Sequence, residues 1–154
     1  MGTDRTGTGA TVRPATSDDY EAVAGLLRAA QLPLDGVPRM LTDFYVAERQ
    51  GRVLGAIGLE VYGSDGLLRS VVVQAAARSA GIGVALIDYA LGQARLRALR
   101  AVYLLTTTAE RYFPRFGFSA IARDDVPHHM SASVEFREAC PASAVVMRKV
   151  LARD

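Results

Sequence analysis

The chain has no tryptophan, one cysteine (Cys140) and one lysine (Lys149) among its 154 residues. A lone cysteine cannot form an internal disulfide, so nothing in the composition indicates an oxidising compartment. The sequence has no run of about 18 apolar residues, which a membrane-spanning helix needs. Its first ten residues also lack the apolar stretch of a secretory signal peptide. We therefore expect a cytoplasmic protein with no membrane partner.

The chain also lacks a large excess of either positive or negative charge. Eighteen basic and sixteen acidic residues leave a net charge of +2, and the cations are scattered along the chain. This balance argues against a nucleic-acid partner. Half of the residues are hydrophobic, and the length suits one domain with a substantial core. We expect a disordered lead over residues 1–10 and a single domain over residues 11–154.

The apolar spacing predicts strands and helices in turn along the chain. The predicted strands are 11–13, 44–48, 52–62, 67–73, 101–105, 118–122 and 144–151. The first predicted helix begins after an N-cap at Thr16 or Ser17 and runs to about Gln31. Two more are predicted over 84–99 and 109–116, and short helical turns at 37–41 and 133–136. The segment with Pro33 and Pro38 is interpreted as a connector, although such segments can cover a pocket. The order predicts an α/β (α+β) domain with a mixed sheet.

A hairpin predicts the most specific polar feature of this sheet. If Gly63–Gly66 forms a simple four-residue loop, Tyr62 faces Leu67 and Glu60 faces Arg69. Side-chain alternation then places a carboxylate and a guanidinium together on an otherwise apolar face. The other members of that face are Leu54, Ala56, Gly58, Val71 and Val73.

A glycine-containing loop joins the strand 67–73 to the helix that follows. Arg78-Ser79-Ala80-Gly81-Ile82-Gly83 ends this loop. The first turn of a helix has unpaired N–H groups and the positive end of the helix dipole, so it suits an anion such as phosphate. A dinucleotide-binding loop would need a small residue at Leu86, and a P-loop would need lysine after Gly83. A plain strand-to-helix turn is the alternative interpretation.

Three motifs at family spacing make the chain resemble the GNAT superfamily of N-acetyltransferases. Arg78–Gly83 is similar to the family's pyrophosphate loop, Gln/Arg-x-x-Gly-x-Gly/Ala, and it follows the Val-rich strand end Val71–Val73. Tyr112–Phe118 resembles the later aromatic-x-x-x-Gly-Phe motif. The resemblance covers nearly the whole chain. It implies a mixed, mostly antiparallel sheet of about seven strands flanked by helices, and acetyl-CoA as acetyl donor. We expect no metal, because no Cys, His or Asp spacing in the sequence is typical of a metal site.

The resemblance also implies residue roles at the cofactor. Main-chain groups around Val71, Val72 and Val73 are expected to pair with the pantetheine arm, and a backbone N–H near Val73 to hold the oxyanion. Phe113 is expected to line the cofactor site. The pyrophosphate is expected at the N–H groups of Arg78, Ser79, Ala80, Gly81, Ile82, Gly83 and Val84.

The acceptor end of the site stays open between alternatives. Glu60 is either the general base or only the ion-pair partner of Arg69. An arginine partner lowers the pKa of a carboxylate and so makes Glu60 a weaker base. Arg69 either holds an anionic acceptor, as guanidinium binds carboxylate, or is structural. Tyr112 is the candidate general acid because Phe113 stands where many relatives have tyrosine; its alternative is packing. His128-His129 is a candidate base or a surface pair, and Cys140 is more simply a packing residue than a nucleophile.

Two further segments resemble a narrower branch of the family. Gly66–Val73 and Cys140–Met147 are similar to arsenic-resistance-associated and amino-acid (glutamate-like) acetyltransferases. The resemblance implies an acetyl-CoA-dependent N-acetyltransferase acting on a small, anionic or amino-acid-like amine, as a homodimer or a monomer. The alternatives are a non-catalytic acyl-CoA-binding module and a peptide or protein amine acetyltransferase.

Overall fold

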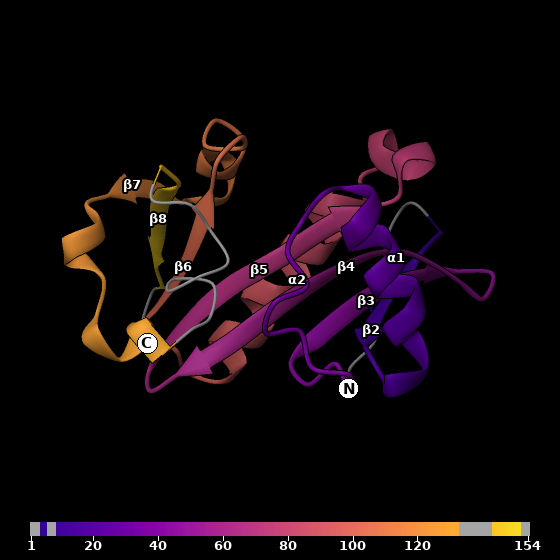
Figure 1. Cartoon of the computed structure of the whole chain (residues 1–154), viewed down its shortest axis with the longest axis horizontal. Coiled ribbons are helices and arrows are strands. Elements are labelled where there is room, and N and C mark those ends of the chain that lie inside the picture. The colour runs from indigo at the N-terminus through magenta and orange to yellow at the C-terminus, as the bar shows by residue number, and fades with distance from the viewer. Residues whose placement is uncertain (1–3, 6–8, 133–142, 152–154) are drawn as a thin grey trace.

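The computed structural model describes residues 4–5, 9–132 and 143–151. Within these ranges eight strands form one sheet in the order β1-β2-β3-β4-β5-β6-β8-β7 (Figure 1). All neighbours are antiparallel except β5 and β6, which are parallel. The strands are β1 (Asp4–Arg5), β2 (Thr11–Pro14), β3 (Phe44–Arg49), β4 (Arg52–Tyr62), β5 (Asp65–Val73), β6 (Ala101–Thr106), β7 (Ser119–Ile121) and β8 (Val145–Val150). The expected mixed, mostly antiparallel sheet is confirmed, and the two-residue β1 adds to its seven predicted strands.

The start of the chain differs from the expected disordered lead. Asp4 and Arg5 pair with Val12 and Thr11 of β2. Ala10 is fully buried in the core. Asp4, Arg5 and Ala10 are thus attached to the folded domain, while residues 1–3 and 6–8 lie outside the described part of the chain.

Two helices cover opposite faces of the sheet (Figure 1). Helix α1 (Tyr20–Ala29) packs Val23 and Leu27 against Phe44, Val46, Ala56 and Val72. Helix α2 (Ile82–Leu96) packs Ile82, Leu86 and Ile87 against Leu54, Ile57, Leu59 and Leu68. No helix among the described residues is long and apolar enough to cross a membrane.

Helix α2 starts two residues before the predicted Val84 and ends three before the predicted Leu99. Gly81 precedes it with φ +81°, a left-handed conformation that glycine adopts without a Cβ clash, so the chain turns directly into the helix there. At the other end Ala98 has φ +58°, which stops the helix before Leu99 reaches the core.

The hairpin between β4 and β5 has a tighter turn than the sequence suggested. Tyr62 pairs with Asp65 and Glu60 pairs with Leu67, so the turn contains only Gly63 and Ser64. The predicted facing of Tyr62 with Leu67 and of Glu60 with Arg69 is therefore wrong. Asp65 belongs to β5 because its side chain is buried and hydrogen bonded, which pulls the turn two residues shorter.

Two register shifts overturn the predicted membership of the polar face. One lies between Ala47 and Glu48 of β3, opposite the start of β4, and the other between Ala56 and Gly58, opposite Ser70 of β5. An extra residue in one strand reverses the side-chain alternation beyond it. The consequence is that Leu54, Val71 and Val73 pack in the α2-side cluster, whereas Arg69 packs beside Gly58 and Phe44 on the α1 side.

The short elements near the chain end are less helical than predicted. The helix expected at 109–116 is a turn followed by a 3-10 helix, Phe113–Phe116, because Pro114 has no N–H to continue an α-helical ladder. Gly117 ends it with φ +96°, as expected of a C-cap glycine. Residues 37–41 form turns without a helix. Cys140 and the helical turn expected at 133–136 lie outside the described residues.

An ion pair secures the start of α1. Arg13 of β2 donates to both carboxylate oxygens of Asp19, at 2.9 and 3.0 Å. Asp19 also accepts from the main-chain N–H of Thr16 at 2.8 Å, which caps the 3-10 helix Ser17–Asp19 that leads into α1. The hydrogen bonds from Arg13 hold the pKa of Asp19 below its usual value.

We expect Asp19→Asn to lower the free energy of unfolding at pH 7 by about 1–3 kcal/mol, because a buried charged hydrogen-bond acceptor is lost. A carboxyl with a lowered folded-state pKa stabilises the fold fully above its unfolded pKa of about 4, and this contribution is lost progressively as the pH falls from there through the folded-state pKa. Urea unfolding at pH 7 and near pH 3 should therefore show the two proteins converging in acid. Asp18→Asn, an exposed neighbour, is the control; a constant gap across pH would contradict the assignment.

Candidate functional site

A cleft opens where β5 and β6 separate. The two strands pair only at Asp65–Leu67 with Ala101–Tyr103, and beyond this point they diverge (Figure 1). The cleft has a volume of about 430 Å³. Its walls come from β5, from the end of β6 with the turn after it, and from the segment after α1. The lining residues are Gln31, Leu32, Pro33, Leu68, Arg69, Ser70, Val71, Leu104, Leu105, Thr106, Thr107, Thr108, Ala109, Tyr112 and Phe113.

Ser70 marks the point on β5 where the strand leaves regular pairing. Its φ is +58°, a left-handed conformation that is unfavourable for a residue with a side chain. Arg69 Nε donates to the Ser70 hydroxyl at 3.0 Å, which helps hold this conformation. Such strain persists only where the surrounding structure enforces it, so the backbone conformation at this part of the cleft wall depends on its neighbours.

The Arg69 side chain is completely buried at this wall and joins three parts of the chain. Besides Ser70, its guanidinium donates to Glu60 Oε2 of β4 at 3.3 Å and to the main-chain oxygen of Asp35 at 2.8 Å. Gly58 makes room for it, because a Cβ there would stand 3.1 Å from Arg69 Cγ and 2.9 Å from the Phe44 ring. The guanidinium thus ties the segment after α1 to the sheet.

Glu60 and Arg69 do form the predicted ion pair, although they are not directly opposite. Arg69 lies two residues beyond Leu67, the partner of Glu60, and long side chains reach such diagonal neighbours. The second carboxylate oxygen of Glu60 accepts from the Tyr62 hydroxyl at 2.8 Å. Both oxygens of Glu60 therefore accept hydrogen bonds, and Tyr62 completes a chain that runs through Glu60 to Arg69.

The predicted phosphate loop leads directly into α2. Residues Ala75–Ala80 form a 3-10 helix, and Gly81 then serves as the N-cap of α2 without a side-chain hydrogen bond to its first turn. Helix α2 therefore presents main-chain donors that no capping side chain covers, which fits a phosphate group. Arg78 and Ala80 are exposed and Ile82 is buried. The side chain of Ser79 lies outside the description.

The far end of β5 meets this loop and the aromatic motif. A Cβ on Gly83 would lie 3.5 Å from the Tyr112 hydroxyl and 3.7 Å from Val73 Cγ2. Arg78 Nε donates to the Val73 main-chain oxygen at 3.3 Å. Val72, in contrast, points into the α1-side core and is 4% exposed. The structure thus brings Val73, Gly83 and Tyr112 together beside the cleft, with Val71 on its wall.

Aromatic packing holds Tyr112 in place. Its ring makes edge contacts with Phe113 and Phe116, each with centroids 5.4 Å apart. Phe113 is buried and also lines the cleft. Before this motif, Thr106 Oγ1 accepts from the Ala109 N–H at 2.9 Å, so a side chain at the exit from β6 caps the turn that follows.

The histidine pair lies away from the described cleft. His129 Nε2 is 2.8 Å from Oδ2 of the buried Asp65, which also contacts Arg100 at 3.4 Å. Asp65 and Arg100 lie at the end where β5 and β6 are paired, whereas the cleft opens at the other end. His129 is thus in a structural cluster, and neither histidine lines the cleft.

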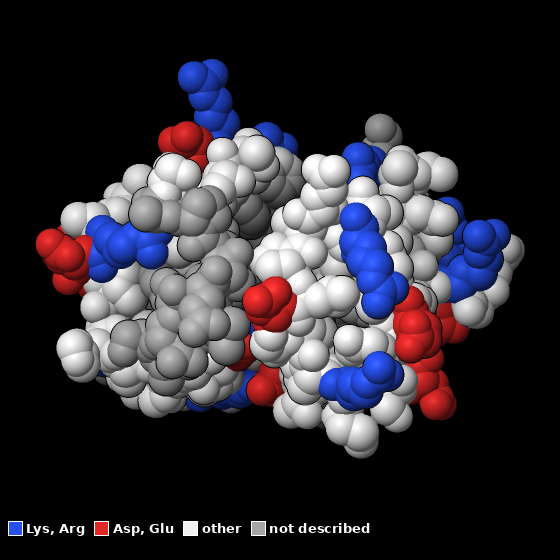
Figure 2. All heavy atoms as spheres, in the orientation of Figure 1, with Lys and Arg blue, Asp and Glu red and all other residues white. Residues whose placement is uncertain are grey.

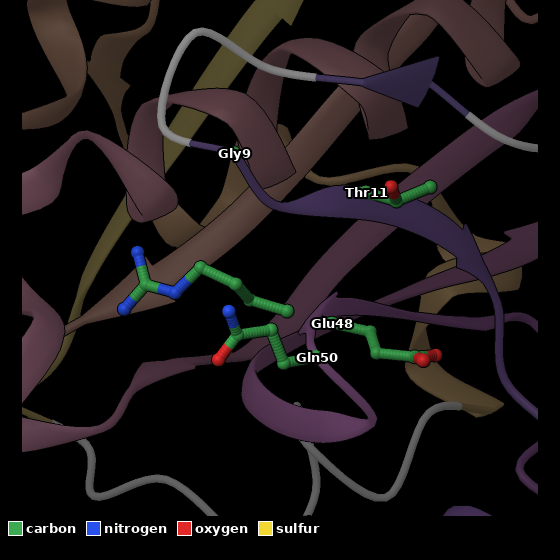
Figure 3. Close-up of a pocket in the computed structure, with 5 residues that line it drawn as sticks. Gly9, Thr11, Glu48 and Gln50 are labelled. Atoms are coloured by element: carbon green, nitrogen blue, oxygen red, sulfur yellow. The ribbon is translucent and has the colours of Figure 1, made fainter.

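A second hollow of about 480 Å³ lies near the start of β2 and the turn between β3 and β4 (Figure 3). Its lining residues are Gly9, Thr11, Glu48, Arg49 and Gln50. Glu48 is paired with Arg13 at 2.6 Å, so its carboxylate already has a structural partner.

Acidic and basic side chains are interspersed on the face in Figure 2. Among the described residues no group of three or more His, Cys, Asp or Glu could hold a metal ion.

Several residues of the cleft and of the Arg69 hydrogen-bond network could not be selected from the sequence. Ser70 sits in a Val-rich strand, and nothing in that pattern indicates a positive φ. Gln31 was placed at a helix end, without a role in a site. Tyr62 had a detectable signal, since it is two residues from Glu60 on the same strand face, but its hydrogen bond depends on rotamers.

Curated relatives of this chain are named amino-acid acetyltransferase. The one from Ralstonia nicotianae is 26% identical over 148 residues, which cover 90% of this chain and 32% of that protein. The one from Mycobacterium tuberculosis is 41% identical over 83 residues, or 51% of this chain and 47% of the relative. The chain thus spans about a third to a half of the length of these relatives.

Solved structures share the fold. A Mycobacterium tuberculosis protein crystallised with CoA is 28% identical, with a TM-score of 0.78 over 92% of this chain and 99% of that one. N-acetylglutamate synthase from Neisseria gonorrhoeae, solved with coenzyme A and N-acetyl-glutamate, has a TM-score of 0.80 at 20% identity, over 94% of this chain and 35% of the synthase.

A family model decides the assignment. The acetyltransferase (GNAT) domain model matches residues 41–120, just over half of the 154 residues. This match contains the cleft-lining part of β5, the loop before α2 and the aromatic motif. With the glycine-started helix, the divergent parallel strands and the arrangement of the sheet, it leads to one conclusion: the chain belongs to the GNAT acetyltransferase family.

Proposed function

We propose that this chain transfers the acetyl group of acetyl-CoA to the amine of a small, anionic or amino-acid-like acceptor. The observation that carries the proposal is the cleft between β5 and β6, which has an uncapped helix N-terminus near one end and Arg69 in its wall. The names of the curated relatives support an amino-acid acceptor.

Acetyl-CoA is proposed to lie with its pyrophosphate at residues Arg78–Val84 and its pantetheine arm along Val71–Val73. The support is that β5 has no β6 pairing beyond Leu67, so this edge of the strand is open to a ligand. Apolar residues such as Val71 and Leu104 suit the thioester arm, and a main-chain N–H near Val73 is the proposed oxyanion donor.

The acceptor carboxylate is proposed to bind Arg69 in exchange for the main-chain oxygen of Asp35. A carboxylate is a stronger acceptor for guanidinium than a neutral carbonyl is. The Asp35 contact belongs to the segment that lines the cleft through Gln31, Leu32 and Pro33. Acceptor binding would therefore release one contact of that segment and replace it with a charged one.

Glu60 is proposed to position Arg69 rather than to remove the amine proton. Its two oxygens are engaged by Tyr62 and Arg69, and it is not among the residues that line the cleft. Removal of Glu60 would leave the buried Arg69 guanidinium without its compensating charge. Glu60 therefore stabilises Arg69 in its position at the cleft wall.

Tyr112 is proposed as the proton donor to the departing thiolate. Its hydroxyl borders Gly83 and Val73, beside the proposed path of the pantetheine arm. Phe113 next to it has no proton to give. That substitution favours one alternative, a non-catalytic acyl-CoA-binding module, which would bind the same ligand without turnover.

Release of free thiol from acetyl-CoA across a panel of amines separates these functions. We expect turnover with amino acids that carry a second carboxylate, and little with neutral amines or with a peptide N-terminus. Tight CoA binding with no turnover for any amine would contradict the enzyme and support the binding module. Preference for the peptide would point to a peptide amine acetyltransferase.

Arg69→Lys tests the acceptor site while it keeps a positive charge. Because lysine cannot reproduce the guanidinium fork, we expect KM for an anionic acceptor to rise about tenfold or more. The KM for acetyl-CoA should change little. Arg97→Lys, a surface arginine paired with Asp43, is the matched control. An equal rise of KM for a neutral amine acceptor would show that Arg69 is only structural, and thermal melting checks that the variant is folded.

Glu60→Gln distinguishes positioning from base catalysis. If Glu60 positions Arg69, the acceptor KM rises and the pH dependence of kcat keeps its midpoint, because no titrating base has been removed. The measurement is a full pH–rate profile of both proteins at saturating acetyl-CoA. A displaced or missing limb in the profile of the variant would instead identify Glu60 as the base.

A further inference from the structure

Arg115 lies in the aromatic motif, and its guanidinium is fixed on a neighbouring ring. The guanidinium carbon is 4.5 Å from the centroid of the Tyr112 ring, and Arg115 Nε donates to the Tyr112 main-chain oxygen at 2.9 Å. Stacking and hydrogen bond together restrain an exposed side chain that would otherwise sample many rotamers. The two terminal nitrogens of Arg115 have no hydrogen-bond partner among the described residues.

This guanidinium stacks on a ring whose hydroxyl reaches the first turn of α2. The Tyr112 hydroxyl lies 3.5 Å from the position of a Cβ on Gly83, the second residue of α2. In the loop before α2, the exposed Arg78 donates to the Val73 main-chain oxygen at the end of β5. The aromatic motif and the loop thus each contribute an exposed guanidinium to this region of the chain.

Charge also favours an anion at Arg115. No carboxylate within the described ranges forms an ion pair with Arg115, whereas five other arginines have such partners. A preorganised and unneutralised guanidinium is well suited to phosphate, which it can bind through two parallel hydrogen bonds. Because its rotamer is already fixed, less side-chain entropy is lost on binding.

We propose that Arg115 binds a phosphate group of acetyl-CoA. This inference rests on the proposed function, since it requires that the cofactor lies along β5 and the start of α2. The cofactor carries a pyrophosphate and a 3′-phosphate, and a guanidinium recognises either group by the same chemistry. Tyr112 then has a second role, because its ring holds the arginine while its hydroxyl faces the cleft.

The test measures binding of CoA and of 3′-dephospho-CoA to the full chain by calorimetry, for the wild type, Arg115→Gln and Arg115→Lys. For Arg115→Gln we expect the dissociation constant of CoA to rise about tenfold, as for loss of one charge-assisted hydrogen bond at a partly exposed site. Arg115→Lys should recover part of this loss because it keeps the charge. Arg95→Gln, at the opposite end of α2, is the control for a general change of charge.

The two ligands identify which phosphate is bound. If the rise disappears with 3′-dephospho-CoA, Arg115 binds the 3′-phosphate; if it stays, Arg115 binds the pyrophosphate. Equal affinities of wild type and Arg115→Gln for both ligands would overturn the inference and leave the proposed function intact. A wild-type protein that binds neither ligand would instead contradict the proposed function itself. Equal losses in Arg115→Gln and Arg95→Gln would reduce the effect to net charge and also overturn the inference.

Discussion

A buried guanidinium needs acceptors from its surroundings, and Arg69 finds them on three separate parts of the chain. Its partners are a carboxylate on β4, a serine hydroxyl on β5 and a peptide oxygen in the segment after α1. Leaving a charge buried without partners costs several kcal/mol, roughly the whole net stability of many small domains. The positions of Glu60, Ser70 and Asp35 are therefore linked, and the cleft wall they form depends on one side chain.

The second constraint is the parallel pairing of β5 with β6. Parallel strands require a crossover between them, and here α2 provides it on one face of the sheet. The same crossover brings the N-terminus of α2 next to the end of β5, where the two strands have already separated. One topological feature thus creates the cleft and also places the N-terminus of α2 beside it.

Local patterns in the sequence were sufficient to predict the approximate positions of the strands and the glycine-containing turn before α2. These features follow from periodicity and from turn chemistry, and the structure agrees with them. The register of the β4–β5 hairpin was not predictable in this way, because a buried Asp65 with distant partners decides it. The same holds for the two register shifts: no local signal in the Val-rich strand shows that Ser70 takes a positive φ. The Glu60–Arg69 contact was predicted from a wrong register, and it survives because long side chains also reach diagonal neighbours.

The short overlap between β5 and β6 has a mechanical consequence. Three residue pairs join the two strands, and Asp65, at the first of these pairs, is held from the side by His129 and Arg100. Among the described residues the sheet therefore consists of two parts, β1–β5 and β6–β8–β7, which are joined only by this short β5–β6 pairing. Since Asp65 does not line the cleft, the contacts of its side chain stabilise the joined end of the two strands without taking part in the walls of the opening.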